Sequence, residues 1–374
     1  MNSSNLVRTK EGTTELMVPQ GFCTRGPGKS SGDVFYNGQM EFSRDISVLL
    51  GRVVLQKGGR ALDGLAASGA RGLRMARECG SDWHFVLNDR NERAAQLIRK
   101  NAELNGLSNV DASCRDLRAL LAEERFQYID IDPFGTPVPF IDAAVQSAHD
   151  DGILAITATD TAPLSGTYPK TCVRRYGALS ARSPFSHESG LRILMGYMVR
   201  EAAKHDRGCE PLLCFHADHY FRCHMRIRRG AGRADKSLAR MGFATYDRNT
   251  LRRGVSTERP SGEVGSMAGP LWCGELHSSD VLDHIGLDSA LGTHRRCEKM
   301  IDLWRGELSA APLYYRVDEL ARHTKSHPPK SVRLIEGLRE NGASASPTHF
   351  DPKGIKTNMP LDELLVVFKA VSER

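Results

Sequence analysis

Long apolar runs are missing from this chain of 374 residues. No stretch approaches the roughly 20 consecutive apolar residues that a transmembrane helix needs, so we expect no membrane contact. Regular cysteine spacing is missing too, since the nine cysteines include no C-x-x-C pair. The odd cysteine count and the lack of a signal peptide favour reduced thiols and a cytoplasmic location.

Two phosphate-binding motifs are also absent. The glycine turn Gly69–Gly72 lacks the G-x-G-x-x-G spacing, because Ala66 and Ala67 occupy the region of the second early glycine. The segment Gly28-Lys29-Ser30 has the end of a phosphate loop, but Cys23 stands where the first glycine is required. The usual motifs for NAD and ATP are therefore lacking.

What the chain does contain is an alternation of strands and helices. Its length allows two domains with separate cores. Its net charge of +6 is compatible with RNA binding without requiring it, because scattered lysines and arginines usually solvate a surface. Four apolar segments predict parallel strands of a doubly wound α/β fold, at 60–66, 84–87, 109–114 and 128–131.

Carboxylates follow three of these predicted strands, at Asp89, Asp116 and Asp132. The carboxyl ends of parallel strands meet at one sheet edge, so we expect the three side chains to line one crevice. Helix capping alone would also explain acidic residues at such positions. A carboxylate-lined adenosine site without a phosphate motif favours S-adenosylmethionine, which is cationic and carries no phosphate.

The segment Asp132-Pro133-Phe134-Gly135 ends the fourth strand. An Asp-Pro pair is often only a turn. At the end of a buried strand, however, a carboxylate can accept hydrogen bonds from an exocyclic amine, and the aromatic ring can stack on the base that carries this amine. The segment therefore favours methyl transfer to an amino group of a nucleobase.

A change in composition marks the second half of the chain. The basic, glycine-rich segment Arg226–Arg233 begins a polar, turn-rich stretch, and we place the domain boundary between residues 228 and 229. Two short helices at 317–324 and 331–341, followed by a basic turn, predict a winged-helix-like end. We expect Arg226–Arg233, His349, Lys353 and Lys356 to contact nucleic-acid phosphates.

Taken in order, these motifs make the chain resemble the tRNA (guanine-26-N2) dimethyltransferases of archaea and eukaryotes. The matching segments cover nearly the whole chain and are 34–37, 43–45, 67–72, 87–89, 130–135, 157–160, 168–169, 174–176, 218–222, 269–272 and 348–357. The resemblance implies a class I S-adenosylmethionine-dependent methyltransferase domain (1–228) and a smaller α+β tRNA-binding domain (229–374). It also implies a monomer with tRNA as its partner.

The resemblance also assigns residues to roles. Those that would contact the cofactor are Arg44, Arg71, Asp89, Asp116 and Leu117. Those that would act on guanine are Asp132, which would engage the amine, and Phe134 and Phe35, which would hold the ring. This chain departs from the family in having Gly38 where proline usually follows Tyr-Asn, and this change should loosen the loop that carries Phe35.

Metal binding and two other functions are alternatives for this sequence. The zinc cysteines of some family members are missing, since residues 241–270 contain no cysteine. Cys214, His216, His219, Cys223 and His224 lie close together, but side chains on opposite faces of a strand do not converge on one ion, so we expect no metal. Two other functions stay open, a methyltransferase for proteins or small molecules and a non-catalytic RNA-binding or chaperone protein.

Overall fold

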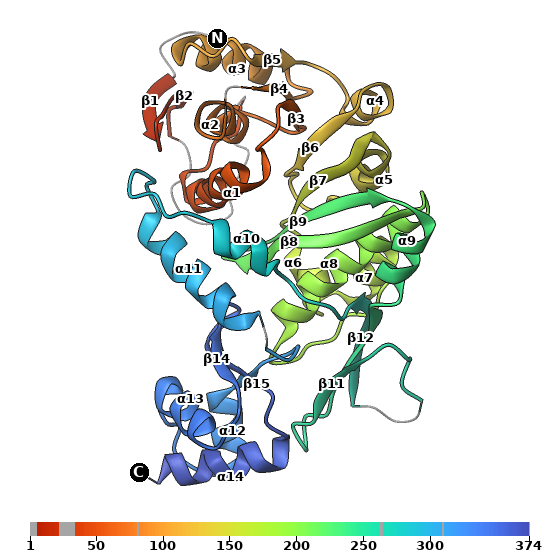
Figure 1. The fold of residues 1–374 in the computed structure, drawn as a ribbon, viewed down its shortest axis with the longest axis vertical. Coiled ribbons are helices and arrows are strands. Elements are labelled where there is room, and N and C mark those ends of the chain that lie inside the picture. Colours follow the sequence, from red (N-terminus) through yellow and green to blue (C-terminus); the bar gives the residue numbers. More distant parts are fainter. Residues whose placement is uncertain (1–5, 22–33, 81, 262–264, 309, 374) are drawn as a thin grey trace.

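A seven-stranded sheet forms the centre of the protein (Figure 1). The structure is a computed structural model that describes all residues except 1–5, 22–33, 81, 262–264, 309 and 374. The strand order is β5-β4-β3-β6-β7-β9-β8, in which β9 alone runs antiparallel to its two neighbours β7 and β8. The strands are β3 (Gly59–Asp63), β4 (Trp83–Asn88), β5 (Val110–Ser113), β6 (Phe126–Ile131), β7 (Ala148–Ala158), β8 (Arg207–Ala217) and β9 (Tyr220–Arg229).

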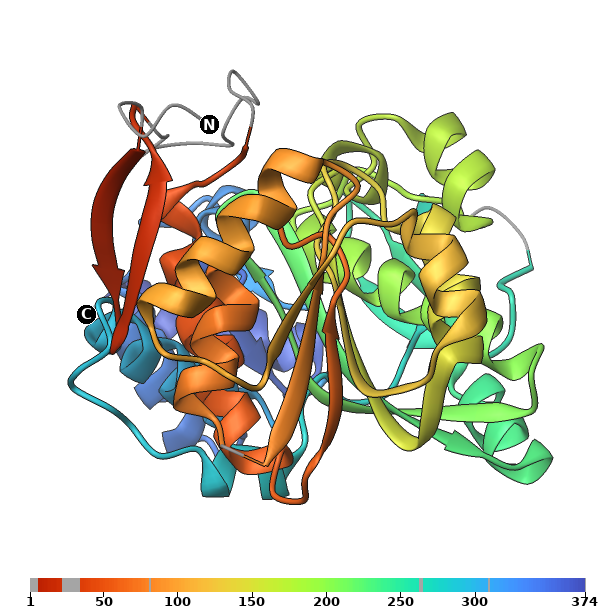
Figure 2. The same ribbon diagram turned by 90° about the horizontal axis from the view of Figure 1, so that it is seen from above.

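Helices cover both faces of this sheet, as Figure 2 shows from above. Alternate strand residues point to opposite faces. Leu62 and Ile129 pack into one core with α4, α5 and α8, whereas Phe85 and Tyr128 pack into a second core with α1, α2 and α3. These helices are α1 (Glu41–Val54), α2 (Ala70–Glu78), α3 (Glu92–Leu104), α4 (Leu117–Glu123), α5 (Val138–Ser147) and α8 (Ser186–Ala203). The predicted doubly wound α/β fold is confirmed.

Smaller elements pack on the helices that cover the sheet. They are the hairpin β1 (Leu6–Glu11) and β2 (Thr14–Pro19), the 3-10 turn η2 (Gly38–Met40), and the helices α6 (Thr161–Leu164) and α7 (Pro169–Tyr176). Because α6 follows the end of β7, both α6 and α7 lie at the carboxyl edge of the parallel strands. Among the described residues, no helix is long and apolar enough to cross a bilayer.

The elements after β9 fall into two groups. The first packs on the larger body, with β12 against α8 and α11 against α1. It consists of α9 (Ala231–Leu238), β10 (Met241–Tyr246), β11 (Arg253–Ser256), β12 (Ser266–Trp272), α10 (Ser279–His284) and α11 (His294–Glu307). The predicted boundary between residues 228 and 229 stays a prediction.

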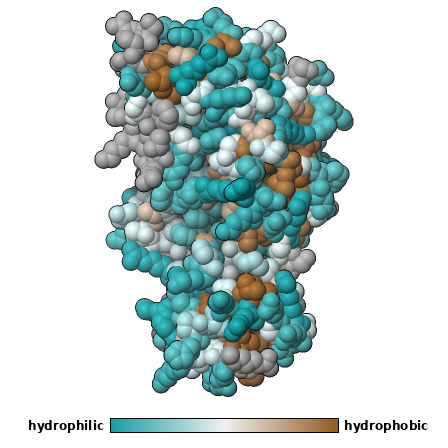
Figure 3. All heavy atoms as spheres, turned by 90° about the vertical axis from the view of Figure 1, so that its left-hand side faces the viewer, coloured by the Kyte–Doolittle hydropathy of each residue, from teal (hydrophilic) through white to brown (hydrophobic). Residues whose placement is uncertain are grey.

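The second group forms a separate C-terminal lobe with its own core. It consists of β13 (Tyr315–Arg316), α12 (Val317–Thr324), α13 (Ser331–Glu340), β14 (Ala345–Thr348), β15 (Asp351–Thr357) and α14 (Leu361–Ser372). Two helices followed by a hairpin, with sheet order β13-β15-β14, give the predicted winged-helix-like end. Figure 3 shows this lobe as narrower than the main body, with a mainly hydrophilic surface.

Several basic residues that we expected to contact phosphates have other roles. The side chain of Lys356 is only 2% exposed, and its ammonium lies 3.2 Å from carboxylate oxygens of both Glu188 and Glu307. His349 is buried beside the same Glu307 carboxylate, at 2.7 Å. Of these residues in the C-terminal turn, Lys353 is exposed, with 63% of its side chain accessible.

The basic, glycine-rich segment Arg226–Arg233 forms the end of β9 and the start of α9. Arg228 is paired with Asp151 at 2.8 Å and with Glu210 at 3.0 Å. Ile227 at the end of antiparallel β9 is paired with Gly152 early in β7. The segment therefore lies at the sheet edge opposite to the carboxyl ends of the parallel strands.

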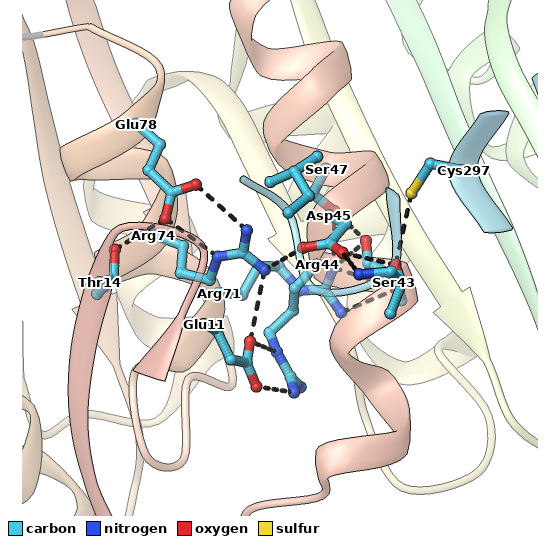
Figure 4. A network of polar contacts seen from close by, with 12 residues as sticks. Glu11, Thr14, Ser43, Arg44, Asp45, Ser47, Arg71, Arg74, Glu78 and Cys297 are labelled. Atoms are coloured by element: carbon cyan, nitrogen blue, oxygen red, sulfur yellow. Dashed lines mark hydrogen bonds and ion pairs between the residues drawn. The ribbon is translucent and has the colours of Figure 1, made fainter. Parts of the chain in front are cut away.

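A buried ionic network joins the hairpin to the helices (Figure 4). The Arg74 guanidinium is fully buried and lies 2.5 Å from Asp45, 3.2 Å from Glu78 and 3.5 Å from Glu11. Glu11 belongs to β1, Asp45 to α1, and Arg74 and Glu78 to α2. Because an unpaired buried charge is costly, this network fixes how the hairpin and the two helices pack.

We predict that Arg74→Met lowers the free energy of unfolding by about 3–5 kcal/mol, because it leaves buried carboxylates without their cation. Denaturant unfolding measures this loss. Arg77→Ala is the control, since Arg77 lies on the exposed side of the same helix, and its effect should stay within about 0.5 kcal/mol. A loss below about 1 kcal/mol for Arg74→Met would contradict this role of the network.

Candidate active site

A cavity of about 700 Å³ opens at the carboxyl edge of the parallel strands. It collects residues from the loops after β3, β4, β5 and β6 and from the segment before α1. All eight residues that we predicted for the site line this one cavity: Phe35, Arg44, Arg71, Asp89, Asp116, Leu117, Asp132 and Phe134. Residues up to about 100 positions apart in the chain thus meet in one place.

Two predicted carboxylates organise the loops at one end of the cavity. Asp89, which follows β4, accepts hydrogen bonds from the backbone N–H groups of Ala67 and Asn91, both at 2.9 Å. Asp116 caps α4 by accepting from the N–H of Arg118 at 2.9 Å. Hydrogen bonding from the Arg118 side chain lowers the pKa of Asp116 below its usual value. Asp116 therefore caps a helix, as the alternative explanation for the acidic residues after the strands predicts.

The glycine turn Gly69–Gly72 allows the start of α2 to pack on the sheet. Gly69 has a left-handed backbone, with φ of 80°, and starts α2. A Cβ atom on Gly72 would lie 2.6 Å from Leu87, so this glycine allows α2 to pack closely on β4. The cavity wall at this turn is made instead by the neighbouring Ala66–Ser68 and by Arg71.

Asp132 is held by a buried guanidinium. The Arg71 side chain donates to Asp132 at 2.5 Å and to the Ser47 hydroxyl at 2.7 Å, and it lies 3.6 Å from Asp130. Asp130 is in turn bound by Arg222 of β9, whose Nη1 donates to it at 3.0 Å. This chain of ion pairs orients the Asp132 carboxylate at the cavity wall.

Asp63 joins the same group of charges from the end of β3. Burial, together with the negative charge of Asp130, raises the pKa of Asp63 to about 7. One of its oxygens accepts a hydrogen bond from the N–H of Gly72 at 3.0 Å. Asp63 lines the cavity, yet our sequence-based assignment missed it. Its place as the last residue of the first strand was the available signal.

The aromatic residues stand at the mouth of the cavity. Phe35 and Phe134 form an edge-to-face pair with ring centroids 4.7 Å apart, and Phe134 is 65% exposed. The loop after Phe134 is fixed, because the N–H of Gly135 donates to the Thr159 hydroxyl at 2.7 Å and the N–H of Thr159 donates to the Gly135 carbonyl at 3.0 Å. An exposed ring on a rigid loop can receive a planar ligand.

The segment that carries Phe35 is also held in place, although Gly38 replaces proline. The hydroxyl of Tyr36 donates to Glu11, and the Asn37 side chain accepts from the N–H of Gln39 at 2.9 Å. Arg44 lines the cavity but directs its guanidinium to Glu11, to which it donates at 2.7 and 2.5 Å. Its predicted contact with a cofactor stays a prediction.

Other lining residues that we missed come from β4 and from the turn between β8 and β9. Asn88 donates to the carbonyls of Gly64 and Arg115, both at 3.1 Å, and so ties three strand ends together. Its place directly before Asp89 was a usable signal. Asp218 in the turn after β8 and Tyr220 at the start of β9 also line the cavity, a placement that only the folded topology brings about.

The cluster of cysteines and histidines on β8 and β9 packs as part of the sheet. Cys214 faces Cys223 across the two strands, and a ring nitrogen of His224 lies 3.0 Å from the Leu213 carbonyl. His216 stacks on His187 at 4.2 Å between ring centroids. Within the part of the chain that the structure describes, no three His, Cys, Asp or Glu side chains are grouped as metal ligands.

Comparison with known proteins adds independent evidence. The family model of N2,N2-dimethylguanosine tRNA methyltransferases matches residues 12–369. The tRNA (guanine(26)-N(2))-dimethyltransferase of Thermococcus kodakarensis is 39% identical, over 98% of this chain and all of that protein. The protein of the same description from Methanoregula boonei is 38% identical, over 99% of this chain and all of that protein.

A solved structure is similar over almost the whole chain. It is that of Trm1 from Pyrococcus horikoshii in complex with S-adenosyl-L-methionine, with a TM-score of 0.88 and 33% identity. The match covers 97% of this chain and 99% of that one.

The raised pKa of Asp63 leads to a prediction about stability. Because the folded pKa of about 7 exceeds the usual value, the folded state keeps a proton that the unfolded chain releases. This carboxyl therefore destabilises the fold increasingly as the pH rises from about 4 to 7. Asp63→Asn, whose amide oxygen still accepts from Gly72, should gain a few kcal/mol over wild type across this range.

Denaturant unfolding of both proteins at several pH values between about 4.5 and 7.5 measures this difference. The exposed Asp235→Asn is the control and should show the same pH dependence as wild type. A stability difference between Asp63→Asn and wild type that does not change with pH would contradict the argument.

Proposed function

This chain belongs to the N2,N2-dimethylguanosine tRNA methyltransferase family, and we propose that the cavity described above carries out the family's reaction. The reaction moves one or two methyl groups from S-adenosylmethionine to the N2 amine of guanine 26 in tRNA. One observation supports this assignment most strongly: Asp132, Phe134 and Asp89, the carboxylate that follows β4, line the same cavity.

The residues of the cavity fit the cofactor. Asp89 stands at the end of β4 with both oxygens fixed by backbone N–H groups, where a ribose would meet it. Asp116, Leu117 and Arg71 are the other residues that would hold the cofactor, and Arg44 supports them from behind through Glu11. When bound, S-adenosylmethionine supplies an electrophilic methyl group to this site.

Asp132 acts on the guanine amine. The lone pair of the N2 nitrogen is delocalised into the ring, so the amine is a weak nucleophile that must be positioned. Asp132 accepts a hydrogen bond from its N–H, and it or an adjacent water takes the proton as the nitrogen becomes positive. Arg71 holds the carboxylate in place at 2.5 Å for this purpose.

Phe134 and Phe35 receive the target base. Guanine 26 is stacked inside folded tRNA, and its extrusion costs a few kcal/mol. Stacking on exposed aromatic rings offsets this cost by about 1–3 kcal/mol per base. The rings at the cavity mouth are 4.7 Å apart edge to face, so one ring has to turn or move aside when the base enters.

The wider organisation is part of the same proposal. Residues 1–228 form the catalytic domain, and residues 229–374 bind the body of the tRNA through phosphate contacts. A monomeric enzyme with tRNA as its partner belongs to the same proposal. A cytoplasmic location is the simplest one for an enzyme that modifies tRNA.

The role of Asp132 is tested by Asp132→Ala. We expect methyl transfer to be lost in single-turnover experiments, while affinities for S-adenosylmethionine and tRNA change only a few-fold. Phe134→Ala is the comparison, because it removes stacking but leaves the carboxylate, and it should cost about 1–3 kcal/mol. A single-turnover rate for Asp132→Ala close to that of wild type would remove this residue from the chemical step.

The role of Asp89 is tested by calorimetry with S-adenosylmethionine. Asp89→Ala should weaken binding by about 1.5–3 kcal/mol, because charge-assisted hydrogen bonds to the cofactor are lost. Asp111→Ala is the control, since Asp111 is an exposed carboxylate on neighbouring β5 that does not line the cavity. Equal cofactor affinity in wild type and a folded Asp89→Ala variant would refute the assignment.

A further inference from the structure

If guanine 26 enters the cavity, the surface that binds the neighbouring tRNA backbone has to lie beside the opening of the cavity. The basic segment Arg226–Arg233 does not, because it lies at the opposite sheet edge. Lys356 is buried in an ion pair, and Lys353 belongs to the C-terminal lobe, outside the cavity wall. The helix α7 does lie at the carboxyl edge, and Figure 2 shows the yellow-green helices that follow β7 beyond the upper ends of the strands.

The position of α7 is fixed directly to the cavity wall. The hydroxyl of Tyr176, its last residue, lies 2.9 Å from the hydroxyl of Thr136, a lining residue two positions after Phe134. The same Tyr176 hydroxyl donates to Asp160 at 2.7 Å, and Arg175 donates to the other oxygen of Asp160 at 2.9 Å. The end of α7 is therefore part of the frame that holds the loop of Phe134.

The two faces of α7 differ. Cys172 and Tyr176, four positions apart, are fully buried. Lys170 and Arg174, also four positions apart, share the exposed face, with Val173 between them. At 1.5 Å per residue, Arg174 and Lys170 lie about 3 and 9 Å along the helix axis from Tyr176. Both cations thus stand within side-chain reach of a strand that enters the cavity.

The charges of this face are available to a ligand. Among the residues that the structure describes, no carboxylate lies within ion-pair distance of Lys170 or Arg174. Arg175 differs, because its pair with Asp160 makes it structural. Tyr168, which precedes the helix, is 59% exposed and adds an aromatic surface. Exposed cations beside an aromatic ring are typical of a surface for single-stranded nucleic acid.

We propose that Lys170 and Arg174 on the exposed face of α7, with Tyr168 directly before the helix, bind the sugar–phosphate backbone next to the extruded guanine. This proposal rests on the proposed function, since it assumes a tRNA substrate whose base enters the cavity. Under this proposal the catalytic domain contributes part of the tRNA affinity that we expected from the C-terminal domain alone. The two cations position the strand, whereas Asp132 and the aromatic pair act on the base.

The test compares two double variants on an unmodified tRNA transcript with guanine at position 26. Lys170→Ala with Arg174→Ala removes the α7 cations. Lys57→Ala with Lys100→Ala is the control, because both lysines are exposed, Lys57 precedes β3, and Lys100 lies in the half of α3 that returns to the opposite edge. Salt titrations of tRNA binding, S-adenosylmethionine affinity and single-turnover rates at saturating tRNA are measured for each.

Each phosphate contact contributes about 0.7–0.9 to the slope of log affinity against log salt. The α7 variant should therefore have a slope smaller in magnitude by about 1.4–1.8. Between about 50 and 200 mM salt, wild type should lose about 10-fold more affinity than this variant does. Cofactor affinity and the saturated rate should stay unchanged.

A slope for the α7 variant equal to those of wild type and the control would overturn the proposal. Equal reductions in both double variants would overturn it too, because the effect would then be one of general charge. If wild-type enzyme binds this tRNA but does not methylate guanine 26, the proposed function fails instead, so the two failures are distinguishable.

Discussion

The Arg71 guanidinium is the interaction on which the rest of the site depends. It is buried at the junction of α1, α2 and β6, where it contacts Ser47, Asp130 and Asp132. Arg222 binds Asp130 from the other side. Two guanidiniums thus face the carboxylates of Asp130 and Asp132, and burial, together with the charge of Asp130, raises the pKa of Asp63 to about 7, which favours the neutral form of this third carboxyl below that pH. A buried cluster of this kind is stable only when its charges balance, so each member restricts the positions of the others.

That balance extends outward to the N-terminal hairpin. Glu11 binds Arg44 of α1 and lies near Arg74 of α2, and it also accepts from Tyr36. The position of Phe35, next to Tyr36, is therefore set by an ion network about 25 residues upstream in the chain. A proline in the loop is not needed for this, which explains how Gly38 is tolerated. Through Glu11, the hairpin thus connects the segment that carries Phe35 to the helices α1 and α2.

Much of the site could be predicted from the sequence because the positions of these residues depend on short segments of the chain, namely a strand and the loop that follows it. Parallel strands converge at their carboxyl ends, so Asp89, Asp116 and Asp132 could be placed in one crevice from their offsets alone. Residues whose roles depend on distant partners could not. Lys356 looked like a surface lysine in a basic turn, yet it neutralises Glu188, 168 positions away. Periodicity and local composition carry no information about such pairs. The Asn88 bridge and the packing role of Gly72 likewise depend on which strands become neighbours.

The electrostatics of the cavity explain how one site serves a cationic cofactor and a polyanionic substrate. Five arginines line the cavity, and four of them are paired with a carboxylate, namely Arg44, Arg71, Arg115 and Arg118, whereas the described residues give Arg90 no such pair. Most of the positive charge of the lining is therefore neutralised, while acceptors remain for hydroxyls and amines. A base can enter such a space, but the backbone that carries it is better held at the rim by cations that no described carboxylate neutralises. Because of this charge pairing, the base binds inside the cavity and the sugar–phosphate backbone binds at its rim. Specificity for the guanine amine and affinity for tRNA therefore depend on different residues.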